Sequence, residues 1–349
     1  MTRQNRLRRR PMAIDGPPIG AFLDVLDEPA LILRRGTILH ANSAARALFG
    51  PAVERSDVRL AIRNPKALSH ILPGEPGDIE VTGIGAFGQP WLLSIRALGD
   101  DRILVRFIDK SAAAAAERMR VDFVANASHE LRTPLAAIVG YAETLADDDD
   151  VEPANRIKFG QTIRSEARRM LRIIEDLMGL SRIEADRFVA PTEAIKIAEV
   201  AISVVEQLQP SAREVGSEIN LAVEGDIPIV LGDRAQLTQM VDNLLSNAIR
   251  YGINQSGDPV EASIGASYGT VTITIADKGQ GISREHLPRL TERFYRVDAA
   301  RSRDSGGTGL GLAIVKHIVE RHRGTLEIRS TIGEGTHVSV VLPAARQAT

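Results

Sequence analysis

Two long stretches of this chain repeat apolar residues with the spacing of an amphipathic helix. In the first stretch the intervals alternate between three and four, over Val121, Val124, Ser128, Leu131, Leu135, Ile138, Ala142 and Leu145. The second stretch continues the pattern with Ile163, Ala167, Met170, Ile174 and Leu177. Such alternation is typical of a heptad seam. We therefore predict two helices within residues 111–185, joined by a hairpin turn at the acidic residues 147–150 and Pro153.

The seams of these two helices are too wide for one pair of helices to bury. Pairing of two chains into a four-helix bundle would cover them. The pattern therefore predicts a homodimer that is joined through an antiparallel helical hairpin.

Residues 192–345 alternate between helical and strand-like patterns. A helix is expected over residues 234–250, with its apolar face formed by Leu237, Met240, Val241, Leu244, Leu245 and Ala248. Residues 271–277 alternate as a strand in which Val271, Ile273 and Ile275 share one face and Asp277 continues it. A short apolar helix should follow from Ala313 to Ile318. These elements predict a C-terminal α/β sandwich.

The N-terminal part mixes a short helix with strand-like runs between residues 18 and 109. Gly36 separates two apolar runs and suits a hairpin turn, and Asn42 is placed to cap the helix that follows. Residues 1–17 are polar and read as a tail. The chain is thus predicted to be a multidomain α+β protein with an α/β module, a helical hairpin and a C-terminal sandwich.

Composition narrows the class of protein. The 43 Lys and Arg residues nearly balance the 45 Asp and Glu residues, which disfavours nucleic-acid binding as the main task. The absence of cysteine excludes disulfides and thiolate metal sites. The longest uncharged runs, residues 81–95 and 262–276, are shorter than the ~20 residues that span a bilayer. No signal peptide is visible, so a cytoplasmic location is expected.

Five arginines cluster in the predicted N-terminal tail: Arg3, Arg6, Arg8, Arg9 and Arg10. A solvated tail is the simpler interpretation. Peripheral contact with an anionic membrane surface is the alternative.

His129 lies beside the first seam and is followed at once by an acid. A nucleophilic imidazole needs one neutral nitrogen and a hydrogen bond that fixes its tautomer. Glu130 could orient the ring or accept its proton. Thr133, four residues on, shares the helical face of His129 and could position a water for hydrolysis. Pro134 cannot donate a hydrogen bond to the carbonyl of Glu130, so we expect the helix to be interrupted or bent there.

Residues 122–135 read Asp-Phe-Val-Ala-Asn-Ala-Ser-His-Glu-Leu-Arg-Thr-Pro-Leu. This segment resembles the phospho-acceptor box of sensor histidine kinases, especially those of the phosphate-regulon type. The resemblance implies that His129 is phosphorylated, that Glu130 is its acid/base partner and that Thr133 serves a phosphatase activity.

A polar stripe on the predicted helix 234–250 suggests a nucleotide site. Asn243, Asn247 and Arg250 share this stripe, and Tyr251 stands at its end. Amide oxygens suit Mg²⁺, a guanidinium suits phosphate and a phenol ring could stack on a base. Asp277, in the buried register of its strand, needs a hydrogen-bond donor such as the exocyclic amine of adenine.

Two glycine-rich segments follow the polar stripe. Gly279 and Gly281 are expected to let the backbone approach a ligand. Residues 306–312 are Gly-Gly-Thr-Gly-Leu-Gly-Leu and lead into an apolar helix, whose N-terminus can present amides to phosphates. A P-loop is excluded because no Gly-Lys-Ser/Thr closes the pattern. A Rossmann fingerprint is excluded because Ile314 occupies the position of its third glycine.

In this order the segments resemble the Bergerat-type ATP-binding domain shared by histidine kinases, gyrase-type topoisomerases, mismatch-repair ATPases and certain chaperones. The resemblance implies that Asn247 is the magnesium ligand and that Asp277 reads adenine. Residues 292–296 and 333–336 match further boxes of the kinases. The implied ATP-binding residues are Asn243, Asn247, Arg250, Tyr251, Asp277, Gly279, Gly281, Ile282, Gly307, Thr308, Gly309, Leu310, Gly311 and Thr336.

Residues 22–33 and 38–45 resemble the start of a PAS domain. His40 and His70 have no spacing that supports haem binding and are interpreted as ordinary histidines.

The predicted function is therefore that of a sensor histidine kinase. It would use Mg²⁺ and ATP to phosphorylate His129 and would pass the phosphoryl group to an aspartate of a response regulator. Two alternatives stay open. One is a Bergerat-fold ATPase that does mechanical work, and the other is a nucleotide-binding scaffold without phosphotransfer.

Overall fold

The computed structural model describes residues 19–85, 88–147, 151–186, 189–252, 257–297 and 307–345. The chain divides into two compact units, residues 1–122 and 123–349. The N-terminal arginine cluster, three of the four aspartates of the predicted turn (residues 148–150) and Gly306 lie outside the described residues.

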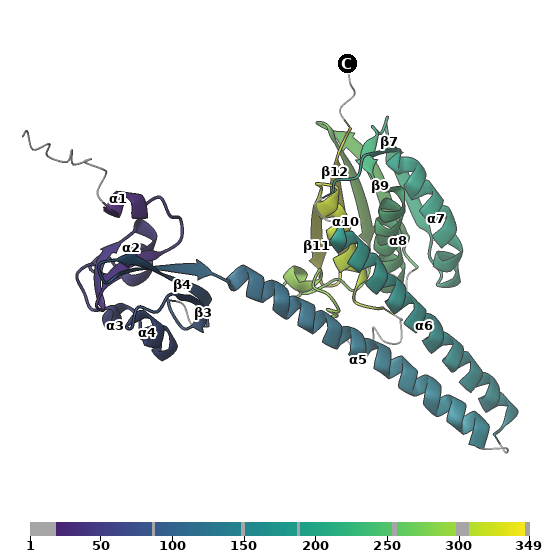
Figure 1. Ribbon diagram of the computed structural model, residues 1–349. Helices are drawn as coiled ribbons and strands as arrows, with labels where there is room; N and C mark the ends of the chain where they lie inside the picture. The colour runs from purple at the N-terminus through teal and green to yellow at the C-terminus, as the bar shows by residue number, and fades with distance from the viewer. Residues whose placement is uncertain are drawn as a thin grey trace, which may run out of the picture. The chain divides into compact units, whose positions relative to one another are not determined.

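The first unit contains a five-stranded antiparallel sheet with the strand order β2-β1-β5-β4-β3. Its strands are β1 (Ala30–Arg34), β2 (Thr37–Ala41), β3 (Gly77–Thr82), β4 (Pro90–Gly99) and β5 (Arg102–Asp109). Its short helices are α1 (Ile19–Leu23), α2 (Ser43–Phe49), α3 (Val58–Ala61) and α4 (Pro65–Ile71). Along the chain, α2, α3 and α4 lie between β2 and β3. Figure 1 shows these three helices together with β3 and β4.

Local sequence explains two features of this unit. Arg35 and Gly36 both have positive φ angles, 48° and 80°, and they form the predicted two-residue turn between β1 and β2. Asn42 caps α2 as predicted, and its side-chain oxygen accepts hydrogen bonds from the backbone N–H groups of Ala45 and Ala30 at 2.9 Å each. Asn42 therefore ties the start of α2 to the sheet.

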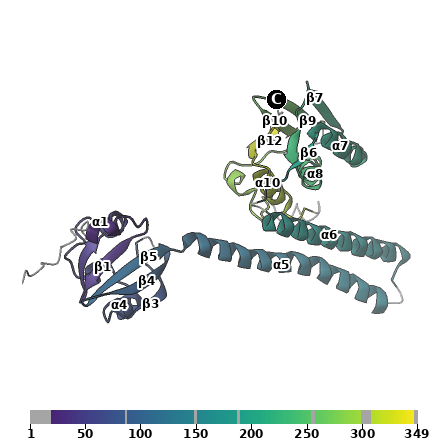
Figure 2. The ribbon, with the colours of Figure 1, turned by 45° about the horizontal axis from the view of Figure 1, so that its top comes forward.

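The helical hairpin consists of α5 (Ser111–Asp147) and α6 (Pro153–Ala185). Residues 123–147 of α5 run antiparallel to α6, and the rings of Tyr141 and Phe159 lie 5.1 Å apart between them (Figures 1 and 2). The predicted hairpin is confirmed. The interruption expected at Pro134 is wrong, because α5 continues through this residue as one helix. A single proline removes only one backbone hydrogen bond, and the turns on either side keep theirs.

The hairpin leaves apolar side chains of its predicted seam exposed. Val121, Val124 and Leu135 on α5 are 57%, 60% and 49% exposed, and Ile174 on α6 is 41% exposed. Burial instead follows a second stripe on α6: Arg169, Ile173, Leu180 and Ile183. Within one chain, one face of α6 is therefore buried, whereas the other face is exposed.

The remaining part of the second unit is an α/β sandwich, as predicted. Its main sheet has the order β11-β12-β10-β9-β7, and only the pair β7·β9 is parallel. The strands are β7 (Ile219–Glu224), β9 (Val260–Ser267), β10 (Thr270–Asp277), β11 (Thr325–Thr331) and β12 (Gly335–Pro343). A small second sheet pairs β6 (Glu193–Ile195) with β8 (Val230–Gly232).

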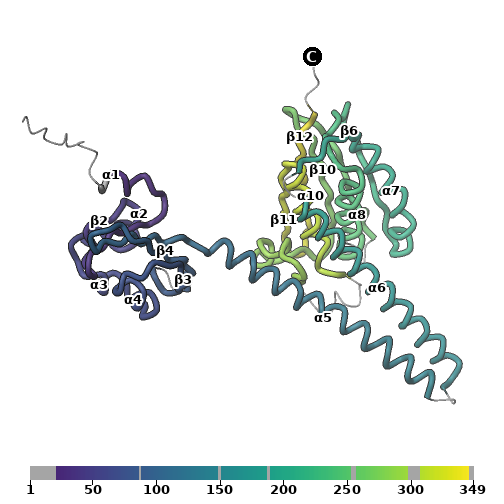
Figure 3. Tube along the Cα trace, viewed as in Figure 1, coloured from purple at the N-terminus to yellow at the C-terminus, as the bar shows by residue number. Residues whose placement is uncertain are grey.

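Three helices cover one face of this main sheet: α7 (Ile197–Glu214), α8 (Arg234–Tyr251) and α10 (Gly311–Arg321). A 3-10 turn, η1 (Leu287–Arg289), follows β10. The predicted apolar face of α8 and the inward residues Val271, Ile273 and Ile275 of β10 are all buried in the shared core. Figure 3 shows α10 beside α6, which it contacts. None of the helices in the described part of the chain is long and apolar enough to cross a membrane.

Candidate functional site

A cavity of about 510 Å³ opens between α8, the segment before α10 and the end of β10. Most of the predicted nucleotide-site residues line it: Asn243, Asn247, Arg250, Tyr251, Asp277, Gly281, Ile282, Gly307, Thr308, Gly309, Gly311 and Thr336. Gly279 and Leu310 do not line it. Gly279 instead donates a hydrogen bond to Asp277, and Leu310 is buried at the start of α10.

The position of α8 follows from its two faces. Its apolar side is buried in the core, which turns the stripe of Asn243, Asn247 and Arg250 into the cavity. The Nδ2 atom of Asn243 is buried and has no hydrogen-bond partner among the described residues. Buried polar atoms nearly always have a partner, so this amide is placed to meet a ligand.

A buried histidine ties the start of α8 to the end of α10. His322 accepts a hydrogen bond at Nε2 from the backbone N–H of Asp233, at 3.0 Å, and Asp233 is the N-cap of α8. Its Nδ1–H donates to the carbonyl of Ile318 at 2.7 Å. Burial lowers the pKa of His322, which keeps the ring in the neutral form that both bonds require. The asparagine stripe is thereby held on a rigid support.

Asp277 is the last residue of β10, and one of its two carboxylate oxygens accepts hydrogen bonds. Its Oδ1 accepts hydrogen bonds from the backbone N–H groups of Gly279, at 2.9 Å, and Thr336, at 3.2 Å. The described residues donate no hydrogen bond to its Oδ2. Burial raises the pKa of this carboxyl, and the two backbone donors oppose that rise. A fixed oxygen at the edge of a cavity suits recognition of an amine on a planar base.

The glycines around Asp277 allow the chain to approach itself closely. A Cβ on Gly281, whose φ is +68°, would lie 1.9 Å from the carbonyl oxygen of Thr331. A Cβ on Gly279 would lie 2.5 Å from the carbonyl oxygen of Tyr251. The absence of a side chain at these two glycines is therefore required by neighbouring backbone, and Gly281 also lines the cavity.

The segment before α10 forms one edge of the cavity. Gly309 has a φ of +72°, and a Cβ there would lie 2.9 Å from Phe294. The N–H of Phe294 donates to the carbonyl of Gly309 at 2.8 Å. Gly309 therefore lies against Phe294, and the N-terminus of α10 faces the cavity through Gly311. A helix N-terminus that presents backbone amides favours phosphate.

His129 is exposed on α5, in agreement with its predicted place at the edge of the seam. The carboxylate of Glu130 contacts Arg169 of α6 at 3.1 Å and Arg296 at 3.7 Å, and within the described residues it makes no hydrogen bond with His129. Thr133 is exposed, and its hydroxyl donates to the carbonyl of His129 at 3.3 Å. The structure thus brings Glu130 to two arginines rather than to the imidazole.

The sequence reasoning missed the contribution of α6. Arg172, Glu175 and Asp176 line the cavity, and Asp176 accepts a 2.8 Å hydrogen bond from the hydroxyl of Thr308. A signal was present, because Arg169, Ile173, Asp176, Leu180 and Ile183 are spaced by four and three. Two positions of this second stripe, Arg169 and Asp176, are charged, so it does not stand out as an apolar repeat.

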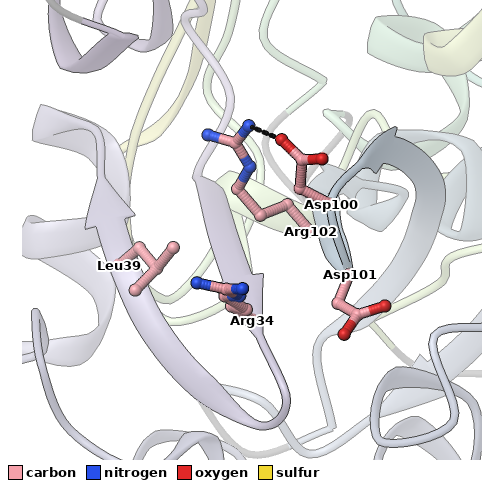
Figure 4. Close-up of a pocket in the computed structure, with 5 residues that line it drawn as sticks. All are labelled: Arg34, Leu39, Asp100, Asp101 and Arg102. Carbon is pink, nitrogen blue, oxygen red and sulfur yellow. Dashed lines mark hydrogen bonds and ion pairs between the residues drawn. The ribbon is translucent and has the colours of Figure 1, made fainter.

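The first unit has a cavity of about 500 Å³ beside β1 and β2. Figure 4 shows the guanidinium of Arg102 bonded to Asp100, with Arg34 and Leu39 nearby. Asp101 pairs with Arg35 at 2.7 Å. The lining consists of strand residues of β1, β2 and β5 and of the turn residues Asp100 and Asp101, and no predicted site residue lies there.

Comparison with known proteins assigns two segments of the chain to domain families. Residues 119–186 match the His Kinase A (phospho-acceptor) domain family. Residues 232–346 match the family of histidine kinase-, DNA gyrase B- and HSP90-like ATPases. The phospho-acceptor helix and the cavity-bearing sandwich therefore each belong to a known domain family.

Similar whole proteins were also found. The phosphate regulon sensor protein PhoR of Pseudomonas aeruginosa is 37% identical over 244 residues, which are 69% of this chain and 54% of that protein. The sensor-like histidine kinase SenX3 of Mycolicibacterium smegmatis is 37% identical over 281 residues, 79% of this chain and 70% of that protein. The chain thus spans about half the length of the first relative and about two thirds of the second.

Among solved structures, ShkA in complex with AMPPNP aligns with a TM-score of 0.49 and 27% identity, over 65% of this chain and 47% of that one. The similarity to SenX3 extends beyond either domain and covers most of both proteins. This chain belongs to the family of sensor histidine kinases.

Proposed function

We propose that this chain phosphorylates its own His129 with ATP and passes the phosphoryl group to an aspartate of a response regulator. The observation that carries the proposal is the cavity around Asn243, Asp277 and Gly311, in the same unit as an exposed histidine on a heptad helix. An ATPase that does mechanical work does not require an exposed histidine on a heptad helix. A scaffold that only binds nucleotide does not require this histidine to be exposed.

In the proposed reaction a nitrogen of His129 attacks the γ-phosphorus of ATP. The bond from that phosphorus to the βγ-bridging oxygen breaks, and ADP leaves with the electron pair. The ring proton passes to a base, for which Glu130 is the adjacent carboxylate. Catalysis of this kind consists mainly of positioning and charge neutralisation.

The donor set of the cavity fits a magnesium–nucleotide complex. Asn243 and Asn247 offer amide groups beside Gly311, and Arg250 offers a positive charge. Mg²⁺ is usually held by few protein groups together with phosphate oxygens, and we propose Asn247 as its protein ligand. The metal would neutralise charge that develops between the β- and γ-phosphates. Asp277 would accept a hydrogen bond from the adenine amine through Oδ2.

Exposed apolar residues on α5 and α6 support a homodimer. In the single chain, large apolar side chains are exposed at Met119, Val124, Leu135 and Ile174. We propose that a second copy covers them in a four-helix bundle.

The radiolabel experiment tests the central proposal. The full chain is incubated with Mg²⁺ and γ-labelled ATP, beside the His129→Ala variant. We expect an acid-labile, base-stable label on the wild type and none on the variant. Label that persists in the variant would refute the assignment of His129.

We also propose a phosphatase role for Thr133, since its hydroxyl lies one turn from His129 on an exposed face. A folded Thr133→Ala variant should keep autophosphorylation and should remove phosphate from the regulator at least about tenfold more slowly. Unchanged dephosphorylation would contradict this role.

For residues 18–109 we propose a PAS-like sensory module. The five-stranded antiparallel sheet with helices between β2 and β3 supports this proposal. Its interior is filled by apolar side chains that include Leu93, Ile95 and Phe107. A transmitting role therefore fits better than an internal ligand site.

A further inference from the structure

Helix α6 supplies one wall of the nucleotide cavity. Three of its residues, Arg172, Glu175 and Asp176, line the cavity together with residues of α8 and of the segment before α10. The other lining residues lie beyond residue 238, in the sandwich. The cavity is therefore shared between the phosphotransfer hairpin and the ATP-binding domain.

A hydrogen bond holds the two parts together at this wall. The hydroxyl of Thr308 donates to Asp176 at 2.8 Å, across 132 positions of the sequence. The same hydroxyl accepts from the backbone N–H of Leu310 at 3.2 Å, next to the first turn of α10. The Thr308 hydroxyl thus links the start of α10 to α6 at the edge of the cavity.

Two positive side chains line the cavity from different helices. Arg172 comes from α6 and Arg250 from α8, and both line the cavity. Burial lowers the pKa of the Arg172 guanidinium, and the charge of Arg250 lowers it further. Asp176 offsets this repulsion in part, but it already accepts the hydrogen bond from Thr308, and burial raises its own pKa. A bound anion would relieve the remaining repulsion.

We propose that Arg172 binds the phosphates of the nucleotide, so that the phosphotransfer hairpin completes the ATP site. The inference rests on the proposed function only in taking a nucleotide as the ligand of the cavity. The guanidinium of Arg172, which lines the cavity together with Arg250, offers forked N–H donors that can hydrogen-bond to phosphate oxygens.

The arrangement couples nucleotide binding to the position of α6. A phosphorylated ligand that contacts Arg172 binds more tightly when the hairpin lies against the sandwich than when it has moved away. By linkage, the ligand favours the docked hairpin by the same factor. A signal that shifts α6 would therefore change the affinity for ATP as well as the access to His129.

The test measures binding of ADP and of adenosine to the full chain by calorimetry, in a His129→Ala background. Adenosine lacks phosphates and reports only on the base pocket. We expect Arg172→Gln to weaken ADP binding about tenfold, as expected for one charge-assisted hydrogen bond, and to leave adenosine binding unchanged. Arg172→Lys should restore part of the ADP affinity, because it keeps the charge without the fork.

Arg168→Gln is the matched control. Arg168 is exposed one turn earlier on α6 and does not line the cavity. Its variant should bind both ligands like the parent.

Three results would overturn the proposal. These are unchanged ADP binding in Arg172→Gln, an equal loss of ADP and adenosine binding, and a loss of the same size in Arg168→Gln. Failure of the proposed kinase function would be seen separately, as absence of label on His129 in the wild type while ADP still binds.

Discussion

The geometry of the site requires that residue 335 has no Cβ atom, a condition that Gly335 meets. Its φ is +110°, and a Cβ there would lie 1.9 Å from the carbonyl oxygen of Asp277. The next residue, Thr336, donates its backbone N–H to the Asp277 carboxylate. The turn between β11 and β12 therefore sets the position of the group proposed to read adenine.

Gly335→Ala and Gly333→Ala form a matched pair of variants. Gly333 also has a positive φ, +82°, but open space surrounds its missing Cβ. Gly333→Ala should cost about 1–2 kcal/mol of unfolding free energy from backbone strain alone. Gly335→Ala adds a steric clash and should cost at least about 3 kcal/mol.

Thermal unfolding and ADP titration test this pair. We expect ADP affinity to fall in Gly335→Ala and to survive in Gly333→Ala. If the two variants have the same stability and the same ADP affinity, the proposed steric clash at residue 335 is wrong.

At the scale of residues, it was largely predictable which polar side chains would line the cavity. Asn243, Asn247 and Asp277 were identified from their spacing on a helix stripe and a strand face, and all three line one cavity. The close backbone neighbours of Gly279 and Gly281 were not predictable. Whether a missing side chain makes room for a ligand or for another strand depends on which segment lies opposite.

At the scale of elements, α6 carries two apolar stripes with different partners. Ile173 is fully buried, whereas its neighbour Ile174 is 41% exposed. Leu180 and Ile183, on the stripe of Ile173, belong to the core of the sandwich. One stripe thus packs within the chain, and we propose that the other packs against a second chain.

Ile173→Ala and Ile174→Ala should separate these two roles. Removal of a buried isoleucine side chain typically costs about 2–5 kcal/mol, so Ile173→Ala should unfold at a clearly lower temperature. Ile174→Ala should change the stability of the fold by less than about 1 kcal/mol and should weaken self-association.

Thermal unfolding and analytical ultracentrifugation distinguish the two effects. The assignment of stripes fails if Ile174→Ala stays as dimeric as the wild type while Ile173→Ala dissociates without loss of stability.

At the scale of the whole second unit, a set of contacts docks the hairpin on the sandwich. The rings of Phe123 and Phe294 lie 6.0 Å apart, and the guanidinium of Arg293 lies 5.2 Å from the Phe123 ring. Arg293 also pairs with Glu184 of α6, and His317 lies 3.6 Å from the same carboxylate. These contacts join residues that follow β10 to both helices of the hairpin.

Glu184→Gln should loosen this docking. The variant keeps the shape of the side chain but loses the charge that pairs with Arg293. Loss of one charge-assisted bond is worth about 1.5 kcal/mol, so hydrogen exchange in residues 292–297 should accelerate about tenfold.

Glu327→Gln provides the control for this measurement. Glu327 pairs with Arg329 at an exposed place on β11 and takes no part in the docking contacts. Its variant should leave exchange in residues 292–297 unchanged, and equal acceleration in both variants would contradict the role of Glu184.

Periodicity along the chain was enough to predict the helical hairpin, the asparagine helix, the strand that ends at Asp277 and the exposure of His129. These features depend on neighbours within a few turns or one strand, and such neighbours leave a repeating pattern in the sequence. The predicted interruption of the helix at Pro134 was wrong. Long helical segments lie on both sides of this residue, and they tolerate the loss of one backbone hydrogen bond.

Contacts between distant segments left no such pattern. The pairing of Glu130 with Arg169 and Arg296, and of Asp176 with Thr308, joins residues that are 39 or more positions apart. Their partners are chosen by how the hairpin packs on the sandwich, which depends on the shape of two folded surfaces. The residues proposed for phosphotransfer could be identified from local sequence patterns, whereas the contribution of α6 to the proposed nucleotide cavity followed only from the packed structure.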